Sequence, residues 1–485
     1  MQGNKGAIRL NDTVISNGYC IGCGACATNM ESPFQIKMTE TGQYQAELAG
    51  DFIGDDGTQP FTELCPFSDD ADNELAVGKK LYAHSCDYSS DLGFYNGTYA
   101  GYVSDMETRS KGSSGGMASW ILEELFATNR IDFVINVKAV NSQGADGHPL
   151  FEFTVVDSIT SIKNNAKSRY YPVEMSKVLK FVKRTPGRYA ITGLPCFIKA
   201  VRLLQQQDPI FEHRIKYCIG LVCGHLKSAR YADSLAWQLG IHPSTLNSID
   251  FRLKDFNSPA NQYLTFATNN RLAKKAPTKD LFGTDWGAGA FKYKACDFCD
   301  DVFCETADVV VGDAWLPEYV SDPWGTNIVL SRKQEIKEMI EDARLDDRLT
   351  LDDLSIEKIV ASQDAGLRHR KGAIAHRLYK EMEKGRWVPQ KRTSPSAKYG
   401  KENDRQRQDS RTVLRDMSHD SFFEALIKND LNIYLESMRP LLEVYLSIKP
   451  PIGRRLLNFI TRAKRSILSQ VFKKYYKIKT IFGLS

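Results

Sequence analysis

The sequence has no long hydrophobic run. No stretch of about 18 consecutive apolar residues, the minimum for a membrane-spanning helix, occurs in the 485 residues. Residues 1–10 also lack the apolar core of a secretory signal peptide. At 42% hydrophobic content, the chain has enough apolar residues for two to four folding units. These features predict a cytoplasmic multidomain protein.

Acidic residues are absent from the carboxyl end. Residues 444–485 contain ten Lys or Arg and no Asp or Glu, so the chain's net charge of +5 comes from this tail and the remainder is net acidic. The overall basicity is therefore no evidence for nucleic-acid binding, and no nucleic-acid partner is predicted. The apolar face of an amphipathic helix is predicted at Leu456, Ile460, Ala463, Ile467, Val471 and Tyr475. Such a helix fits peripheral contact with an anionic membrane surface, or packing on a partner or on the protein itself.

The cysteine pattern favours metal ligation over disulfides. The eleven cysteines are odd in number and occur partly at two-residue spacing in a chain without secretory features. Cys20, Cys23 and Cys26 have the spacing of a bacterial ferredoxin, and Cys65 precedes Pro66 as the last ferredoxin ligand does. These four residues predict one 4Fe-4S cluster in a loop-rich amino-terminal unit. A zinc site is the alternative, although structural zinc sites usually use two separated Cys-x-x-Cys pairs.

A second group of cysteines follows apolar, strand-like segments. Cys196 ends the segment Tyr189–Pro195, and Cys223 ends the segment Ile219–Val222. Cys296 and Cys299 form a Cys-x-x-Cys pair that precedes another apolar strand, residues 307–315. Because the carboxyl ends of parallel strands meet at one edge of a sheet, these sulfurs are predicted to converge on one site of an α/β domain.

Two polar segments are candidate cofactor sites. Ser114, Gly115 and Gly116 precede a helical pattern that begins at Met117, and uncovered amides at such a junction can bind phosphate. The segment Lys167-Ser168-Arg169-Tyr170 combines cations with an aromatic ring, which suits a phosphate-bearing aromatic cofactor. From the residues alone, a loop with a helix cap is the commoner explanation of the first segment, and a solvated loop is the commoner explanation of the second.

The order of the core motifs resembles that of a known family. The motifs are Gly193-Leu194-Pro195-Cys196, Cys223-Gly224-His225, Cys296-x-x-Cys299, and Ala307-Asp308 through Gly312-Asp313-Ala314-Trp315. As a set they are similar to the beta subunit of coenzyme F420 hydrogenase/dehydrogenase, a family related to plant 7-hydroxymethyl chlorophyll a reductase. The resemblance covers about residues 80–335, and many members also carry a ferredoxin-like amino-terminal unit.

The resemblance implies an iron-sulfur flavoprotein. It places a 4Fe-4S cluster on Cys196, Cys223, Cys296 and Cys299, beside a non-covalent FAD. It also places Ser114, Gly115 and Gly116 near the flavin, together with Lys167, Ser168, Arg169 and Tyr170. Cys86, Cys218 and Cys304 are left over as structural thiols. No catalytic residue is assigned.

The predicted organisation is therefore α/β with five segments. These are a ferredoxin-like 4Fe-4S domain (1–78), an FAD and 4Fe-4S core (79–335), a helical segment (336–395), a polar linker (396–412), and a helical extension with the basic tail (413–485).

The predicted function is an oxidoreductase that takes single electrons from ferredoxin or another one-electron donor. The electrons pass through two 4Fe-4S clusters to FAD, which exchanges a hydride with a small-molecule substrate, either deazaflavin-like or a biosynthetic intermediate. One alternative is an electron-transfer adaptor docked to a larger redox or polysaccharide-biosynthesis enzyme. Another is a zinc-stabilised interaction protein.

Overall fold

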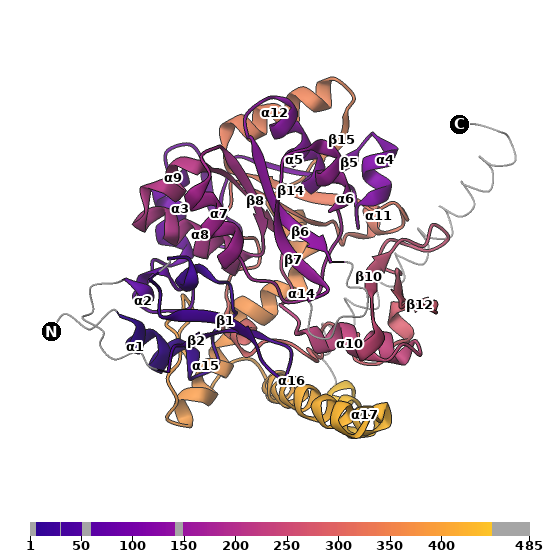
Figure 1. Ribbon diagram of the computed structural model, residues 1–485. Helices are drawn as coiled ribbons and strands as arrows, with labels where there is room; N and C mark the ends of the chain where they lie inside the picture. Colours follow the sequence, from indigo (N-terminus) through magenta and orange to yellow (C-terminus); the bar gives the residue numbers. More distant parts are fainter. Residues whose placement is uncertain (1–5, 30, 51–59, 141–148, 449–485) are drawn as a thin grey trace, which may run out of the picture.

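A mixed eight-stranded sheet forms the centre of the computed structural model, which describes residues 6–29, 31–50, 60–140 and 149–448 (Figure 1). The order across the sheet is β15-β5-β14-β13-β9-β8-β6-β7. The strands are β5 (Gly97–Val103), β6 (Phe133–Ala139), β7 (Phe151–Val156), β8 (Tyr189–Gly193), β9 (Ile215–Leu221), β13 (Val309–Asp313), β14 (Asn327–Ser331) and β15 (Leu349–Asp353).

The four inner strands β6, β8, β9 and β13 run parallel, and the outer pairs are antiparallel. Inner strands of a parallel sheet are buried on both faces, which explains why β8, β9 and β13 are almost continuously apolar. In β13, Val309 and Val311 belong to one hydrophobic core and Val310 to the other. The α/β fold class is thereby confirmed.

Helices cover both faces of the sheet. Helix α5 (Met117–Ala127) and helix α12 (Gln334–Leu345) pack on the face that carries Val309 and Val311. Helix α8 (Pro195–Gln207) packs on the opposite face. Pro195 occupies the first turn of α8, where the missing amide proton of proline costs no helical hydrogen bond.

The amino-terminal unit packs against the sheet domain and the carboxyl-terminal helices. The Tyr44 amide donates to Tyr293 Oη at 2.7 Å, and the Met175 amide donates to the Cys23 carbonyl at 2.9 Å. Tyr19 Oη also donates to the Trp387 carbonyl at 3.2 Å. The elements of this unit are α1 (Ala7–Leu10), η1 (Asn11–Ile15), η2 (Ala25–Ala27), β1 (Phe34–Met38), β2 (Tyr44–Leu48), α2 (Phe61–Leu64) and α3 (Glu74–Tyr82).

Shorter elements connect the main layers. They include a hairpin and a three-stranded antiparallel sheet of order β10-β11-β12. The strands are β3 (Asp87–Ser89), β4 (Gly93–Tyr95), β10 (Ser248–Leu253), β11 (Leu264–Thr268) and β12 (Ala273–Pro277). The helices and helical turns are α4 (Met106–Lys111), α6 (Ile159–Asn164), α7 (Ser176–Arg184), α9 (Pro209–Arg214), α10 (Ala229–Gln238), η3 (Pro243–Thr245), η4 (Thr278–Asp280), η5 (Lys294–Phe298) and α11 (Pro317–Val320).

The carboxyl-terminal region is helical, and Figure 1 shows α15, α16 and α17 at the same end of the sheet domain as the amino-terminal unit. Its elements are α13 (Ile356–Ser362), α14 (Asp364–Leu367), the π-helical turn η6 (Arg368–Gly372), α15 (Ile374–Glu383), α16 (Glu402–Lys428) and α17 (Leu431–Ser447). Residues 402–412, expected as part of a polar linker, form the first turns of α16. Their polar character reflects a helix with one solvated side, because Gln408 is buried whereas Glu402 and Asn403 are exposed.

The predicted basic amphipathic helix falls on residues 449–485, outside the described residues. None of the helices between residues 6 and 448 that the structure describes has both the length and the apolar character needed to cross a membrane.

Candidate functional site

The four core cysteines lie together at the carboxyl ends of the inner strands. Cys196 is in the first turn of α8, directly after β8, and Cys223 lies two residues beyond β9. Cys296 is in η5, and Cys299 follows it. Burial, and then the neighbouring Cys299, Cys223 and Cys296, raise the pKa of the Cys196 thiol well above its usual value. The fold therefore brings these predicted ligands to one place.

Hydrogen-bond donors surround the core cysteines. The Leu226 amide donates to Cys296 Sγ at 3.2 Å. The guanidinium of Arg370 donates to Cys299 Sγ at 2.9 Å and to Cys223 Sγ at 3.5 Å. Burial raises the pKa of the Cys223, Cys296 and Cys299 thiols to about 11 in each case, even though Arg370 lowers all three. Buried thiols ringed by N-H donors fit an iron-sulfur cluster, whose metal deprotonates its thiol ligands.

The amino-terminal cysteines form a second group around a small apolar cavity. Cys20, Cys23, Cys26 and Cys65 all line this cavity, which Pro66 and Phe67 also border. Burial, and then Cys23, Cys20 and Cys65, raise the pKa of the Cys26 thiol well above its usual value. Although 39 residues separate it from Cys26 in sequence, Cys65 is thus part of the same group.

At two glycines around this cavity, the backbone leaves no room for a side chain. Gly22 and Gly24 have φ of +64° and +87°, and a Cβ on Gly22 would lie 2.4 Å from the backbone of Tyr44. The Gly22 amide points at Cys20 Sγ at 3.4 Å, and the Ala46 amide reaches the same sulfur at 3.3 Å. Backbone amides aimed at sulfur are typical of a ferredoxin-type loop.

The two cysteine groups are neighbours, and α8 lies between them. Cys23 of the amino-terminal group also raises the pKa of Cys196 in the core group. One turn further along α8, the charge of Lys199 lowers the pKa of Cys65, which burial raises to about 12. Each group is therefore within electrostatic range of α8.

A single-ion site is a different matter from a cluster. In the parts of the chain that the structure describes, no group of three or more His, Cys, Asp or Glu side chains is arranged to hold one metal ion. The ligation of two 4Fe-4S clusters by the eight cysteines stays a prediction.

A cavity of about 1530 Å³ opens beside the core cysteines. Cys223, Gly224 and His225 form part of its wall, so one predicted cluster ligand faces the cavity directly. Its other walls come from the ends of the inner strands and from the segments around Ser114 and Tyr170. Its volume exceeds that of usual small-molecule pockets, roughly 300–1,000 Å³, and leaves room for a dinucleotide.

Six of the seven predicted flavin-binding residues line this cavity: Ser114, Gly116, Lys167, Ser168, Arg169 and Tyr170. The seventh, Gly115, is not in the cavity wall. A Cβ at Gly115 would lie 2.7 Å from the Gly101 carbonyl and 2.9 Å from Asn327 Oδ1, so this glycine allows close packing against β5 and β14.

The two predicted segments meet in the folded chain. The Ser168 amide donates to Ser113 Oγ at 2.9 Å, which joins the glycine-rich turn to the cationic segment. The first amide of α5, that of Met117, donates to Asn327 Oδ1 at 3.1 Å and is therefore already occupied. Lys167 pairs with Asp250 at 3.0 Å, whereas Arg169 Nε is buried and has no hydrogen-bond partner among the residues that the structure describes. Of these groups, Arg169 has a donor left for a ligand.

Aromatic rings form one side of the cavity. Tyr170 and Trp286 have ring centroids 4.8 Å apart, and His225 stacks on Trp286 at 4.2 Å with an interplanar angle of 19°. Burial, and then Lys227 and other cations, lower the pKa of His225 well below its usual value, so the imidazole is neutral. Within the described part of the chain, His225 Nε2 has no hydrogen-bond partner, and it adds a second buried polar atom at the cavity.

Charged groups complete the cavity wall. Arg252 donates two hydrogen bonds to Asp313 at 2.8 and 2.9 Å, so Asp313 is the anionic partner of a buried arginine. Lys227 is 1% exposed and lies over the rings of Tyr231 and Trp286. Burial, and then Lys292, lower the pKa of Lys227 to about 7. Lys227 can therefore exchange a proton near neutral pH.

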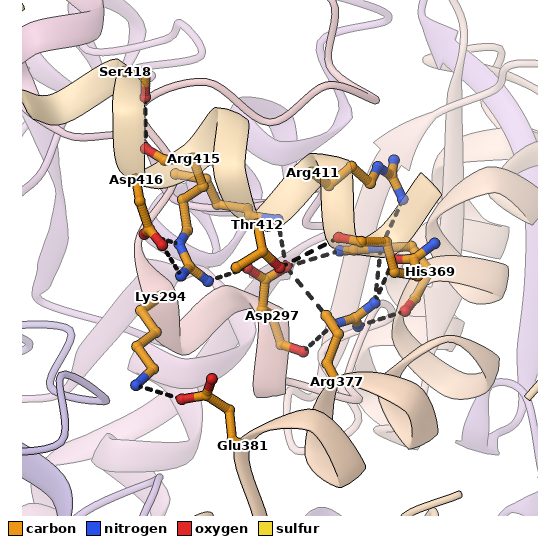
Figure 2. A network of polar contacts seen from close by, with 12 residues as sticks. Lys294, Asp297, His369, Arg377, Glu381, Arg411, Thr412, Arg415, Asp416 and Ser418 are labelled. Atoms are coloured by element: carbon orange, nitrogen blue, oxygen red, sulfur yellow. Dashed lines mark hydrogen bonds and ion pairs between the residues drawn. The ribbon is translucent and has the colours of Figure 1, made fainter. Parts of the chain in front are cut away.

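Asp297, inside the Cys-x-x-Cys pair, is held by a network from the carboxyl-terminal helices (Figure 2). Arg415 of α16 reaches Asp297 Oδ2 at 2.5 Å, and Arg377 of α15 lies 3.7 Å from Oδ1. Lys292 contacts the same carboxylate. Burial alone would raise the pKa of Asp297, but Lys292, His369, Arg415 and Arg377 hold it well below its usual value.

The tautomer of His369 follows from its neighbours. Arg411 lies 2.8 Å from His369 Nδ1, and a guanidinium can only donate, so Nδ1 accepts. Burial, and then Arg377 and Arg411, lower the pKa of His369 well below its usual value. The imidazole is therefore neutral and presents its Nε2 proton to Asp297 Oδ1, 3.5 Å away.

The three remaining cysteines are packed elsewhere. Cys86 Sγ donates to the Arg332 carbonyl at 3.0 Å, and Cys218 is fully buried in β9. Cys304 has φ of +47°, and its side chain packs against Gly220 of β9.

The α/β domain thus has one cysteine group beside a large cavity and a second cysteine group around a small one. The family model for the amino-terminal part of the coenzyme F420 hydrogenase/dehydrogenase beta subunit matches residues 98–180, and the model for its carboxyl-terminal part matches residues 187–357. Together they cover more than half of the chain. The chain therefore belongs to this oxidoreductase family, and the predicted resemblance is confirmed.

Two individual proteins are similar to parts of this chain. A coenzyme F420-dependent sulfite reductase from Methanocaldococcus jannaschii is 23% identical over 353 residues, a match that covers 69% of this chain and 47% of the relative. The chain thus spans about half the length of that protein. A chain of the F420-reducing NiFe hydrogenase complex from Methanosarcina barkeri is 15% identical, with a TM-score of 0.47, over 62% of this chain and 98% of that chain.

Several residues at the site carry no local sequence signal. Arg370 is 71 residues from Cys299, and Trp286 belongs to no motif, yet both lie against the predicted ligands or the cavity. Asp297 is within the Cys-x-x-Cys motif, but its partners come from segments that only the fold brings together.

Proposed function

We propose that the chain is an iron-sulfur flavoprotein oxidoreductase. Cys20, Cys23, Cys26 and Cys65 would hold one 4Fe-4S cluster, and Cys196, Cys223, Cys296 and Cys299 a second. FAD would occupy the cavity of about 1530 Å³. The observation that carries the proposal is the position of Cys223, which belongs to the core cysteine group and also forms part of the cavity wall.

The arrangement supports a path for electrons through the protein. When bound, the two clusters supply one-electron transfer, and FAD collects two electrons and one proton for exchange as a hydride. A reduced ferredoxin, or another one-electron carrier, would be oxidised at the amino-terminal group twice for each hydride delivered. Cys23 and Cys196 stand where the two groups approach each other.

The residues of the cavity have separate tasks in this proposal. Tyr170 and Trp286 supply aromatic surface for the flavin ring, and the buried Arg169 supplies a donor for a phosphate. Lys227 holds a proton that is exchangeable near pH 7. The hydride acceptor or donor would be a deazaflavin cofactor or a small biosynthetic intermediate, in keeping with the family to which the chain belongs.

Anaerobic purification followed by cofactor analysis tests the proposal. Two 4Fe-4S clusters require about eight iron and eight sulfide per chain, together with one FAD. Rapid reduction of the bound flavin by reduced ferredoxin, followed by oxidation with candidate acceptors, would then establish turnover. A colourless protein that contains zinc and no flavin would contradict the proposal.

An electron-transfer adaptor is the second candidate. It is favoured by the matched family models, which describe a beta subunit and therefore one part of a larger enzyme. An adaptor would accept electrons from ferredoxin but would pass them on only after a partner enzyme is added. Turnover of a small molecule by the isolated chain would exclude this second function.

A further inference from the structure

Arg370 is a buried arginine that contacts two of the core cysteines. It lies in the π-helical turn η6, and its side chain is 1% exposed. Nη1 is 2.9 Å from Cys299 Sγ, and Nη2 is 3.5 Å from Cys223 Sγ. These sulfurs are two of the four that would hold the core cluster. π-Helical turns frequently occur at functional sites.

The remaining hydrogen bonds of Arg370 go to backbone carbonyls. Nη2 and Nε donate to the Gly224 carbonyl at 2.5 and 3.2 Å, and Nη1 donates to the Asp301 carbonyl at 2.9 Å. No carboxylate is among these partners. A buried cation without an anionic partner is strongly destabilising. The charge that would offset it is the negative charge of the cysteine site itself, because Cys299 and Cys223 are the side chains to which Arg370 donates.

The amino-terminal group has a different electrostatic environment. The hydrogen bonds to Cys20 Sγ come from the uncharged amides of Gly22 and Ala46. The nearby cation Lys199 is itself paired with Glu74 at 3.3 Å. Within the described residues, the core group therefore has a direct cationic donor that pairs with no carboxylate, with the buried Asp301 and Asp300 acting on Cys299 only through their charge, whereas the hydrogen bonds to Cys20 come from neutral donors.

We infer that Arg370 is a positioning residue that raises the reduction potential of the core cluster above that of the amino-terminal cluster. The inference rests on the proposed function. The potential of an iron-sulfur cluster depends on net charge and on hydrogen bonds to its sulfurs. Reduction adds one negative charge beside a fixed guanidinium, so Arg370 stabilises the reduced state more than the oxidised state.

The resulting difference in potential gives electron transfer a direction. With both clusters bound, one electron would leave the reduced amino-terminal cluster, which would become oxidised, and enter the core cluster, which would become reduced, with no proton moved. The ferredoxin-type donor would then reduce the first cluster again. Arg370 lies beyond residue 357, where the family match ends, so the carboxyl-terminal segment contributes to the redox site.

A redox titration of the intact protein, followed by electron paramagnetic resonance, tests this role. In Arg370→Gln, the reduction equilibrium of the core cluster should shift at least tenfold toward the oxidised form, which is about 59 mV for one electron. The conservative variant Arg370→Lys should recover most of the shift. Arg344→Gln is the control, because Arg344 of α12 pairs with Asp353 at 3.1 Å and is not among the residues that line the cavity. The control should leave both potentials unchanged.

The two cluster signals are told apart with Cys65→Ala, which perturbs only the amino-terminal one. An unchanged core potential in Arg370→Gln, or an equal shift in Arg344→Gln, would overturn the inference. If Arg370→Gln loses the core cluster, retention of cluster and potential in Arg370→Lys supports the inference, and loss in both variants overturns it. Wild-type protein without two clusters would instead refute the proposed function.

Discussion

Replacement of Asp297 by Asn tests the connection between the carboxyl-terminal helices and the core cysteines. The substitution keeps the size of the side chain and removes its charge. Lys292, Arg377 and Arg415 would then be buried around a neutral amide. At an effective dielectric constant of 20, charges 3.7 Å apart, as between Arg377 and Asp297, attract by about 4.5 kcal/mol.

The net effect is smaller than the sum of such pairs, because the cations regain some solvation when the network relaxes. Removal of one partner from a buried ion pair costs about 3–5 kcal/mol. We expect a loss of that size in the free energy of unfolding of the core. The visible absorbance of the core cluster should disappear at a lower denaturant concentration, while the amino-terminal cluster is retained longer.

Asp416→Asn provides the control for this experiment. Asp416 binds the same Arg415 at 2.7 Å, but its side chain is 56% exposed. Its loss should change the free energy of unfolding by less than about 1 kcal/mol, as is usual for a surface ion pair. Denaturant titrations of the two variants, monitored by cluster absorbance and tryptophan fluorescence, make the comparison. Equal stability of Asp297→Asn and wild type would refute the reasoning.

Three further predictions concern single side chains. Cys65→Ala should leave a labile or three-iron centre at the amino-terminal group, seen as altered paramagnetic resonance with an intact core cluster; an unchanged spectrum would contradict this. Cys304→Ala should keep iron and flavin and cost about 1–3 kcal/mol of stability. Cys223→Ala should instead lose the core cluster and weaken FAD binding. The opposite result would exclude the predicted ligands of the core cluster. The stability of the wild type should rise between pH 7 and 10.5 relative to that of Lys227→Met, because in this range Lys227 is protonated in the unfolded chain and deprotonated in the folded chain. Denaturation at several pH values measures the two stabilities. Parallel stability curves would argue against a lowered pKa of Lys227.

The sheet and the grouping of the cysteines could be predicted from short sequence patterns. Apolar segments that end in Cys196 and Cys223 indicated inner parallel strands, and the structure has β8 and β9 side by side in that orientation. The spacing of Cys20, Cys23 and Cys26 indicated one tight loop, and that loop is found. Such patterns are visible because each depends on neighbours in sequence.

Other parts of the site depend on contacts across long distances in sequence. Nothing around Arg370 distinguishes it from the other arginines of the region, and its role becomes visible only when η6 packs beside Cys299. Gly115 looked like part of a phosphate turn, but it serves close packing against β5 and β14. The polar stretch at 402–412 resembled a linker because its buried face is made of polar groups such as Gln408, which binds Arg377 at 2.7 Å.

The attachment of the amino-terminal unit has a consequence for the proposed electron path to the core. Hydrogen bonds from Tyr44 to Tyr293 and from Met175 to Cys23 join this unit to the sheet domain as one body. The unit is therefore held in a fixed position and is not a mobile domain that would carry electrons by moving between two binding sites. The rate of electron transfer between the amino-terminal and the core cysteine groups would therefore not depend on solvent viscosity. Only the binding of the external donor would be limited by diffusion.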